Sequence, residues 1–161
     1  MMSQNDMILK AMQENMSKAI AFVPWAKEIG LELIGVERGK ARGKIKWSEH
    51  LIGDPDTGVI HGGVITSLLD NLAGMAVVAA LDEFKSTATL DLRIDYMRPA
   101  EKGSDILGEA ECYHVTRTVA FVRATAYQEG DNKIVATGTG AFALNDPNNW
   151  NGTPSPSGDG S

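Results

Sequence analysis

Residues 58–81 read GVIHGGVITSLLDNLAGMAVVAAL and form the longest apolar stretch of the chain. A His-Gly-Gly motif at 61–63 precedes a run that is typical of a helix with apolar residues on nearly every side. One acid, Asp70, and one amide, Asn71, interrupt the run near its centre. Because such a helix must be covered on most sides, the stretch predicts a long helix at the centre of the core.

Segments that alternate between apolar and polar residues lie on both sides of this helix. Two precede it and four follow it, joined by short turns, which make consecutive strands antiparallel neighbours. A six-stranded antiparallel sheet covers a central helix on most sides only by curling around it. The sequence therefore predicts an α+β fold in which a curled sheet is wrapped around the helix. The six segments are 31–39, 40–50, and about 87–97, 105–115, 118–128 and 132–143.

The first segment after the helix alternates with a period of two. This places its apolar residues on one face and its polar residues on the other. The apolar face comprises Leu90, Leu92, Ile94 and Tyr96, and the polar face comprises Thr89, Asp91, Arg93 and Asp95.

The length and composition indicate a single domain. The chain has 161 residues, of which 43% are hydrophobic, enough for one core. Apolar residues at helical spacing predict an amphipathic lead-in helix within 1–24 that ends at Pro24. We expect the main domain at 25–144, and the composition of 145–161 is typical of a disordered tail.

The charge and the cysteine content exclude several classes of function. A net charge of −6 and a pI near 5.0 argue against a nucleic-acid or membrane-surface partner. Asp70 and Asn71 argue against a transmembrane helix. The single cysteine, Cys112, excludes an internal disulfide, and the N-terminal residues do not resemble a signal peptide, so we expect a cytoplasmic protein. His50 and His114 lack ligand spacing, so no metal site is expected.

The His-Gly-Gly motif offers a site for a developing negative charge. Glycines at a helix start, Gly62 and Gly63, allow a substrate to approach amides that lack helical partners. Such donors stabilise the oxyanion of an ester or thioester in the transition state. The alternative is a tight turn that lets the helix pack on a strand. His61 is a candidate general base, or else a structural group that orients the carbonyl or the helix start.

Asp70 is the candidate catalytic carboxylate of the helix. It lies eight residues after Gly62, so about 12 Å separates the two along a helix. One chain cannot bring both to the same carbonyl, but two helices packed antiparallel about a two-fold axis can. The sequence thus favours a homodimer with two shared sites. The alternative is that Asp70 and Asn71 hydrogen-bond to loop backbone.

The segments GVIHGGVITSLLDNLAGMA and TATLDLRIDYMRPA resemble the hotdog-fold acyl-CoA thioesterases of the PaaI type. The resemblance covers about residues 28–143 and implies a hotdog fold, a dimer or dimer of dimers, and hydrolysis of an acyl-CoA to an acid and free CoA. It implies further that the Gly62 amide holds the thioester oxygen and that Asp70 is the nucleophile or general base. It also places His61 beside the site and Thr89 near the attacking water.

The acyl-CoA substrate sets further expectations. Guanidinium groups suit phosphate oxygens, so Arg93, Arg98 and Arg117 are candidate contacts for the phosphates of CoA, which is part of the substrate; no separate cofactor is expected. We expect the loop 49–60 and the N-terminal helix to shape the acyl pocket. Its apolar residues, such as Met12, Met16 and Trp25, suit aromatic or medium aliphatic groups.

The sequence is compared with three other functions. A serine hydrolase is disfavoured because the chain lacks a Gly-x-Ser-x-Gly turn. A hotdog dehydratase or hydratase and a non-catalytic acyl-CoA-binding module remain as alternatives. Release of free thiol distinguishes hydrolysis from binding.

Overall fold

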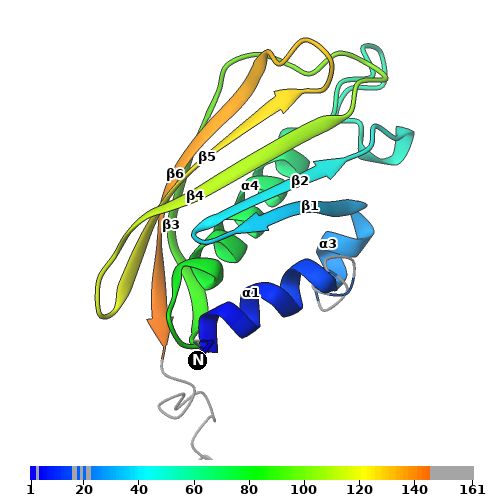
Figure 1. Ribbon diagram of the computed structural model, residues 1–161. Coiled ribbons are helices and arrows are strands. Elements are labelled where there is room, and N and C mark those ends of the chain that lie inside the picture. The colour runs from blue at the N-terminus through cyan, green and yellow to red at the C-terminus, as the bar shows by residue number, and fades with distance from the viewer. Residues whose placement is uncertain (3, 16–17, 19, 21–22, 146–161) are drawn as a thin grey trace, which may run out of the picture.

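The computed structural model describes residues 1–2, 4–15, 18, 20 and 23–145. Six strands form one antiparallel sheet that curls around a single long helix, α4, as Figure 1 shows. The predicted α+β architecture is therefore confirmed. In chain order the elements are α1 (Gln4–Glu14), α3 (Pro24–Glu28), β1 (Leu31–Glu37), β2 (Lys40–Ile45), the 3-10 turn η1 (Glu49–Leu51), α4 (Gly62–Ala80), β3 (Ser86–Tyr96), β4 (Ile106–Val115), β5 (Val119–Gln128) and β6 (Ile134–Asn145).

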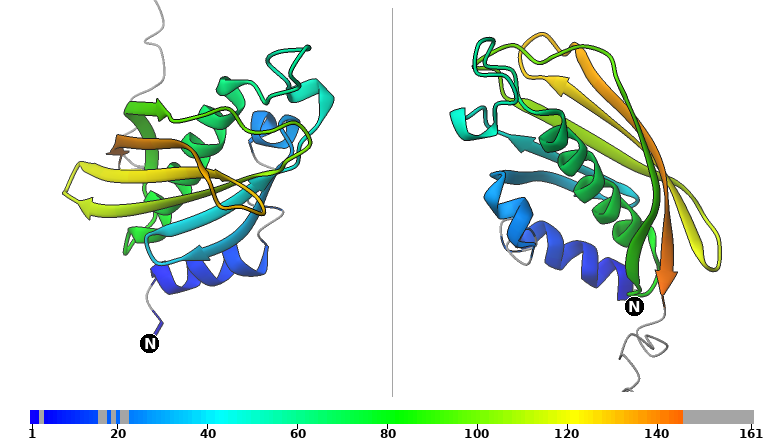
Figure 2. Two further views of the ribbon diagram at one scale, coloured as in Figure 1. Left: turned by 90° about the horizontal axis from the view of Figure 1, so that it is seen from above. Right: turned by 180° about the vertical axis from the view of Figure 1, so that it is seen from behind.

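The strand order of the sheet is β1-β2-β4-β5-β6-β3, and every neighbouring pair is antiparallel. β1 and β3 are thus the two edges. Seen from behind in Figure 2, α4 lies in the hollow of the sheet, and α1 and α3 lie on the β1 side of it. Among the described residues, α1 and α3 pack mainly against β1 and α4 rather than against β3.

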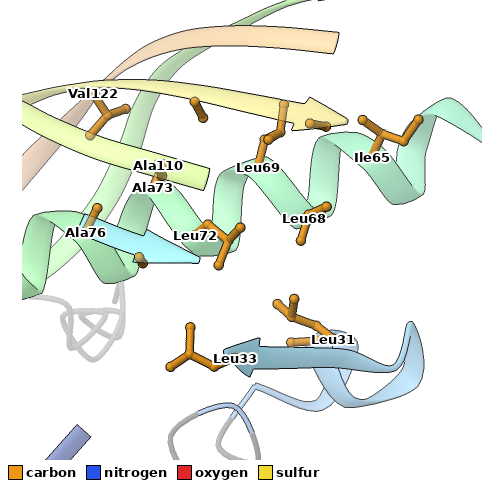
Figure 3. Packing of buried hydrophobic residues seen from close by; sticks show 14 of the residues in the cluster. Leu31, Leu33, Ile65, Leu68, Leu69, Leu72, Ala73, Ala76, Ala110 and Val122 are labelled. Atoms are coloured by element: carbon orange, nitrogen blue, oxygen red, sulfur yellow. The ribbon is translucent and has the colours of Figure 1, made fainter. Parts of the chain in front are cut away.

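The core forms where α4 meets the inner face of the sheet. Leu68, Leu69 and Leu72 have no exposed surface. Figure 3 shows Leu68 and Leu72 on the side of α4 that faces β1. The sheet makes room with glycine, because a Cβ at Gly108 would lie 2.7 Å from a methyl carbon of Leu72. α4 is long and apolar enough to span a membrane, but the core helices of soluble proteins often share this length and hydropathy. Here Leu68, Leu69 and Leu72 are buried in the core against the sheet.

The N-terminal segment differs from the expected single helix. α1 ends at Glu14, and the next residue, Asn15, donates its side-chain amide to the Ala11 carbonyl at 3.3 Å. The Asn15 backbone amide donates to the same carbonyl at 3.0 Å, so the last helical hydrogen bond is kept. Pro24 does not end a helix but opens α3, because proline is well suited to the first helical position. The expected tail lies outside the described residues beyond Asn145, which itself belongs to β6.

Two other boundaries differ from expectation. β2 ends at Ile45, short of residue 50, because residues 49–51 turn into η1. The expected loop 49–61 is held at its base by a bridge between Ile52 and Ile60. This bridge fixes the chain just before the start of α4.

β3 contains a bulge that changes which of its residues face the helix. Its register to β6 shifts between Thr89 and Asp91, which leaves Leu90 as the extra residue. Leu90 is 61% exposed, whereas the Thr89 hydroxyl reaches α4. The expectation that Thr89 shares a face with Asp91, and Leu90 a face with Leu92, is therefore wrong. A regular alternation across the whole strand does not exist.

Candidate active site

The start of α4 is capped by the histidine of the His-Gly-Gly motif. His61 is the N-cap residue, and its Nδ1 accepts a 2.8 Å hydrogen bond from the Gly63 amide. Its carbonyl accepts from the Val64 amide at 2.9 Å. Because Nδ1 is the acceptor, this geometry requires the neutral tautomer of His61 with its proton on Nε2. His61 thus caps the start of α4.

The two glycines differ in what remains available for a substrate. The Gly63 amide is occupied by His61. Within the described part of the chain, the Gly62 amide has no hydrogen-bond acceptor. A free amide at the N-terminus of a long helix is a suitable donor to an oxyanion. Of the two expected oxyanion donors, the structure leaves Gly62 open.

Tyr96, at the end of β3, lies against this first turn. Its hydroxyl donates to the Gly62 carbonyl at 2.9 Å, and its oxygen lies 2.5 Å from the Thr66 hydroxyl. Neither Tyr96 nor Thr66 was predicted as a site residue from the sequence. The signal that existed was the alternation of β3, which set Tyr96 on the same face as Leu92 and Ile94.

Asp70 lies half-buried in the middle of α4. The Thr89 hydroxyl donates to its carboxylate at 2.9 Å, which is the contact that the bulge in β3 allows. Among the described residues no second hydrogen bond reaches this carboxylate. Its neighbour Asn71 behaves differently, because its side chain donates to the Ser67 carbonyl of the same helix. Asn71 therefore bonds to backbone, whereas Asp70 faces a side chain and open space.

A concavity of about 370 Å³ adjoins Asp70 and Thr89. Most of its remaining wall is apolar, and one wall residue, Met12, comes from α1. The other lining residues are Val23, Asn71, Gly74, Met75, Val78, Thr87 and Phe142. Of the two segments expected to shape the acyl pocket, α1 contributes Met12 to this concavity, whereas no residue of the loop 49–60 lines it. Trp25 instead donates to the Ser67 hydroxyl at 2.8 Å, and Met16 is outside the described residues.

Gly62 borders a different concavity. This second hollow, of about 350 Å³, is lined by Ile60, Gly62, Ile65, Tyr96, Met97, Arg98 and Pro99. It shares no residue with the concavity at Asp70. Within one chain the two candidate catalytic groups therefore belong to separate hollows, in line with their separation of about 12 Å along α4.

The three candidate arginines occupy different surroundings. Arg98 lines the Gly62 concavity, and its Nε and Nη2 are buried without a hydrogen-bond partner among the described residues. Nη2 of Arg98 forms a longer ion pair, 3.6 Å from Oδ1 of Asp131. The pKa of Asp131 is lowered by hydrogen bonds from Lys133 and by the charges of Lys133 and Arg98. Arg93 forms an ion pair with Asp95, and Arg117 is exposed in the turn between β4 and β5. Only Arg98 is brought next to Gly62.

Other reactive side chains do not gather into a site. Burial raises the pKa of the Cys112 thiol, which disfavours the thiolate needed in a nucleophile. His50 bonds to Ser48, and His114 stacks on Phe121. In the part of the chain that the structure describes, no three His, Cys, Asp or Glu side chains are placed to hold a metal ion.

Comparison with known proteins identifies the family. The model of the family described as Thioesterase superfamily matches residues 57–135. The medium/long-chain acyl-CoA thioesterase YigI of Salmonella typhimurium is 28% identical over 135 residues, which are 76% of this chain and 86% of that protein. A crystal structure of a Pseudomonas aeruginosa protein is 39% identical, with a TM-score of 0.70 over 78% of this chain and 93% of that one.

The fold is also shared with the E. coli PaaI protein from the phenylacetic acid degradation operon. The two chains are 18% identical, and the TM-score is 0.75 over 86% of this chain and 96% of the PaaI chain. The curled sheet around α4 is thus the hotdog fold that the resemblance implied. The chain therefore belongs to the thioesterase superfamily and is a thioester hydrolase.

Proposed function

We propose that this protein hydrolyses acyl-CoA thioesters at sites shared between two copies of the chain. The thioester oxygen accepts from the Gly62 amide of one copy, and Asp70 of the other copy attacks the carbonyl carbon or activates a water. The observation that carries this proposal is the division of the machinery. One chain holds a free helix-start amide in one hollow and a carboxylate with an open oxygen in another.

The edge strand β3 supplies the means of bringing the halves together. It has 11 residues and is the last strand of the sheet, and it exposes Leu90 and Tyr96, followed directly by the exposed Met97. Thr89, near one end, contacts Asp70, and Tyr96, at the other end, contacts Gly62. Antiparallel pairing of two β3 strands about a two-fold axis sets the Thr89 end of each beside the Tyr96 end of the other.

Two such pairings are formed at once, because a two-fold axis repeats every contact. Each dimer therefore has two equivalent sites, and the exposed apolar residues of β3 become buried. Association of two of these dimers would give a homotetramer.

The reaction follows from the chemistry of the two halves. Attack on the carbonyl carbon moves an electron pair onto the thioester oxygen, where the Gly62 amide and the positive end of the α4 dipole stabilise the charge. The C–S bond then breaks, and the CoA sulfur leaves and takes up a proton. If Asp70 attacks directly, water hydrolyses the resulting anhydride; if it acts as base, it takes the proton of the attacking water. In both routes the Thr89 hydroxyl holds one carboxylate oxygen and leaves the other free.

The concavity beside Asp70 supports an unbranched aliphatic acyl group of medium length. Beyond Asp70 its wall carries no charged side chain, and its larger apolar side chains include Met12, Met75, Val78 and Phe142. Methionine side chains adapt their shape to flexible alkyl chains. The name of the related YigI proteins, medium/long-chain acyl-CoA thioesterase, agrees with this substrate class.

A panel of acyl-CoAs with a thiol-detecting reagent tests the proposed function. The panel should include straight chains from four to sixteen carbons and one arylacetyl-CoA. We expect turnover with a maximum at medium chain length. Saturable binding of acyl-CoA without release of thiol would contradict the proposal and favour a binding module.

A further inference from the structure

The phenol of Tyr96 lies between the edge strand and the first turn of α4 and contacts both the Gly62 carbonyl and Thr66. We propose that Tyr96 is a positioning residue, which aims the Gly62 amide at the substrate through a hydrogen-bond chain from Thr66 to Tyr96 to Gly62. We call these three residues the Tyr96 chain. The inference rests on the proposed function, because it assigns a role to a residue that touches the oxyanion donor.

The direction of the Tyr96 chain follows from the number of protons. A carbonyl only accepts, so the phenol proton of Tyr96 must lie on its bond to Gly62. The phenol has no second proton, and the hydroxyl of Thr66 is therefore the donor in the 2.5 Å contact between them. Hydrogen bonds aligned in this way polarise one another, and each strengthens the next.

Both peptide units that flank the Cα of Gly62 are held. The preceding unit carries the free Gly62 amide, and its carbonyl, that of His61, accepts from the Val64 amide at 2.9 Å. The carbonyl of the following unit accepts from Tyr96 at 2.9 Å. A donor held from both sides needs no reorganisation when negative charge develops on the substrate, which is the condition for oxyanion stabilisation.

The glycine at position 62 matches the closeness of the phenol. A Cβ there would lie 3.3 Å from both the hydroxyl oxygen and a ring carbon of Tyr96, so a larger residue would push the ring away. The absence of a side chain at Gly62 therefore leaves room for the Tyr96 ring. Gly63 serves a different purpose, because a Cβ there would lie 3.0 Å from Nδ1 of His61 and would crowd the helix cap.

The Tyr96 chain extends through the backbone to His61. The Gly62 carbonyl and the Gly63 amide belong to one peptide unit, and this amide donates to Nδ1 of His61 at 2.8 Å. A hydrogen bond to the carbonyl of a peptide unit polarises its N–H and strengthens the bond that this N–H makes. The state of the Gly63 amide therefore reports on Tyr96 independently of catalysis.

The decisive variant is Tyr96→Phe, which keeps the ring against Gly62 and deletes the hydroxyl. Loss of an oxyanion donor lowers kcat by about 10²–10³, and a donor that is present but less well aimed should lose less. We expect kcat to fall about tenfold, with KM within about twofold of the unaltered protein. Thr66→Val should act in the same direction with a smaller effect. The double variant should be no worse than Tyr96→Phe alone, because both changes break one chain.

The control is Tyr127→Phe. Tyr127 also donates to an acceptor, at 2.8 Å to Glu109, and burial together with this carboxylate raises the pKa of Tyr127 to about 12. Glu109 lines a hollow on another face of the sheet, away from α4. Loss of this phenol hydroxyl should leave kcat unchanged. The same preparations are compared by thermal melting and size-exclusion chromatography, so that a purely structural effect is recognised as a lower Tm with normal kcat.

Hydrogen exchange of the Gly63 amide gives the second readout. We expect faster exchange in Tyr96→Phe and not in Tyr127→Phe. Normal kcat in folded, dimeric Tyr96→Phe, alongside inactive Asp70→Asn, would overturn the positioning role and leave the proposed function standing. If the unaltered protein releases no thiol from any acyl-CoA, the proposed function fails, and unchanged Gly63 exchange in Tyr96→Phe would then refute the Tyr96 chain as well.

Discussion

The hydroxyl of Thr89 donates to the carboxylate of Asp70 at 2.9 Å and joins the edge strand to the middle of the central helix. This contact holds one carboxylate oxygen, and the other has no hydrogen-bond partner among the described residues, while Asp70 borders the apolar concavity. This arrangement leaves the Asp70 carboxylate accessible to a substrate or to a second copy of the chain.

Asp70→Asn should abolish hydrolysis while preserving the fold. Asparagine has nearly the same shape and still accepts from Thr89, but it neither attacks a carbonyl efficiently nor takes a proton from water. We expect kcat to fall by about 10² or more, with unchanged Tm and oligomeric state. Thiol release at near-normal rate would remove Asp70 from the catalytic machinery.

Mixing two inactive variants tests whether the site is shared. Asp70→Asn and Gly62→Pro each destroy one half-site. Gly62 is the first residue of α4, and His61 has φ −61° and ψ 134°, a backbone that accepts a following proline. Half of randomly mixed dimers are heterodimers with one whole site, so activity should recover to about one quarter of the wild-type value.

Two controls accompany this mixing experiment. Gly62→Ala adds the same Cβ beside Tyr96 but keeps the amide, so it should be far more active than Gly62→Pro. The second control mixes Asp70→Asn with Thr89→Ala. If Thr89 belongs to the same half-site as Asp70, the mixture should be no more active than the Thr89→Ala subunits alone at that dilution. If Thr89 serves the other half, each mixed dimer gains one restored site and the activity rises above that level. That last outcome would contradict the assignment of Thr89 to the same half-site as Asp70.

Met12→Trp should shorten the preferred acyl chain. Met12 lines the concavity beside Asp70, and a larger side chain there fills space that an alkyl chain would occupy. Each methylene that no longer fits loses about 0.8 kcal/mol, or about fourfold in kcat/KM. Met7→Trp is the matched control, since Met7 is on the same helix and 53% exposed. A chain-length profile identical in both variants would show that the acyl group lies elsewhere.

Arg98→Ala and Arg117→Ala should weaken binding of the CoA portion of the substrate. A guanidinium that meets a phosphate forms charge-assisted hydrogen bonds, and losing them should raise KM by about tenfold. The measurement compares an acyl-CoA with a short thioester that lacks the nucleotide, for which KM should not change. Equal effects on both substrates would show that the arginine in question does not contact the phosphates.

Stability should depend on pH through Asp105. Partial burial raises its pKa, but hydrogen bonds from the Trp47 amide and Lys44 outweigh this, and the net pKa is lowered from 3.8. A lowered pKa stabilises the fold above the unfolded-state value, and this contribution is lost as the pH falls through the folded-state value. The Tm difference between the unaltered protein and Asp105→Asn should thus be largest near neutral pH and vanish in strong acid. A constant difference would refute the charge-based contribution.

The sequence predicted the elements well because each has its own period. The apolar run around Leu68 and Leu72 and the alternation in six segments depend on local spacing, which the fold preserves. The end of α1 at Glu14 could not be predicted, because the apolar spacing continues beyond this residue.

The site was predicted less completely, because its contacts join distant parts of the chain. Asp70, Gly62 and Thr89 were named, but the capping of Gly63 by His61 and the contact of Tyr96 with Gly62 depend on tertiary geometry. The bulge at Leu90 was also invisible, because one extra residue in a strand does not disturb the apolar and polar pattern on either side of it.

That bulge sets the parity of the edge strand. Thr89 and Tyr96 are seven residues apart, and in a regular strand an odd spacing would point them to opposite faces of the sheet. The extra residue, Leu90, makes the effective spacing even, so one strand serves Asp70 with one end and Gly62 with the other. A relative with five residues between the corresponding positions and a straight strand would present the same two groups to the same helix. In alignments of relatives, a one-residue deletion at Leu90 is therefore compatible with both contacts, that of Thr89 with Asp70 and that of Tyr96 with Gly62.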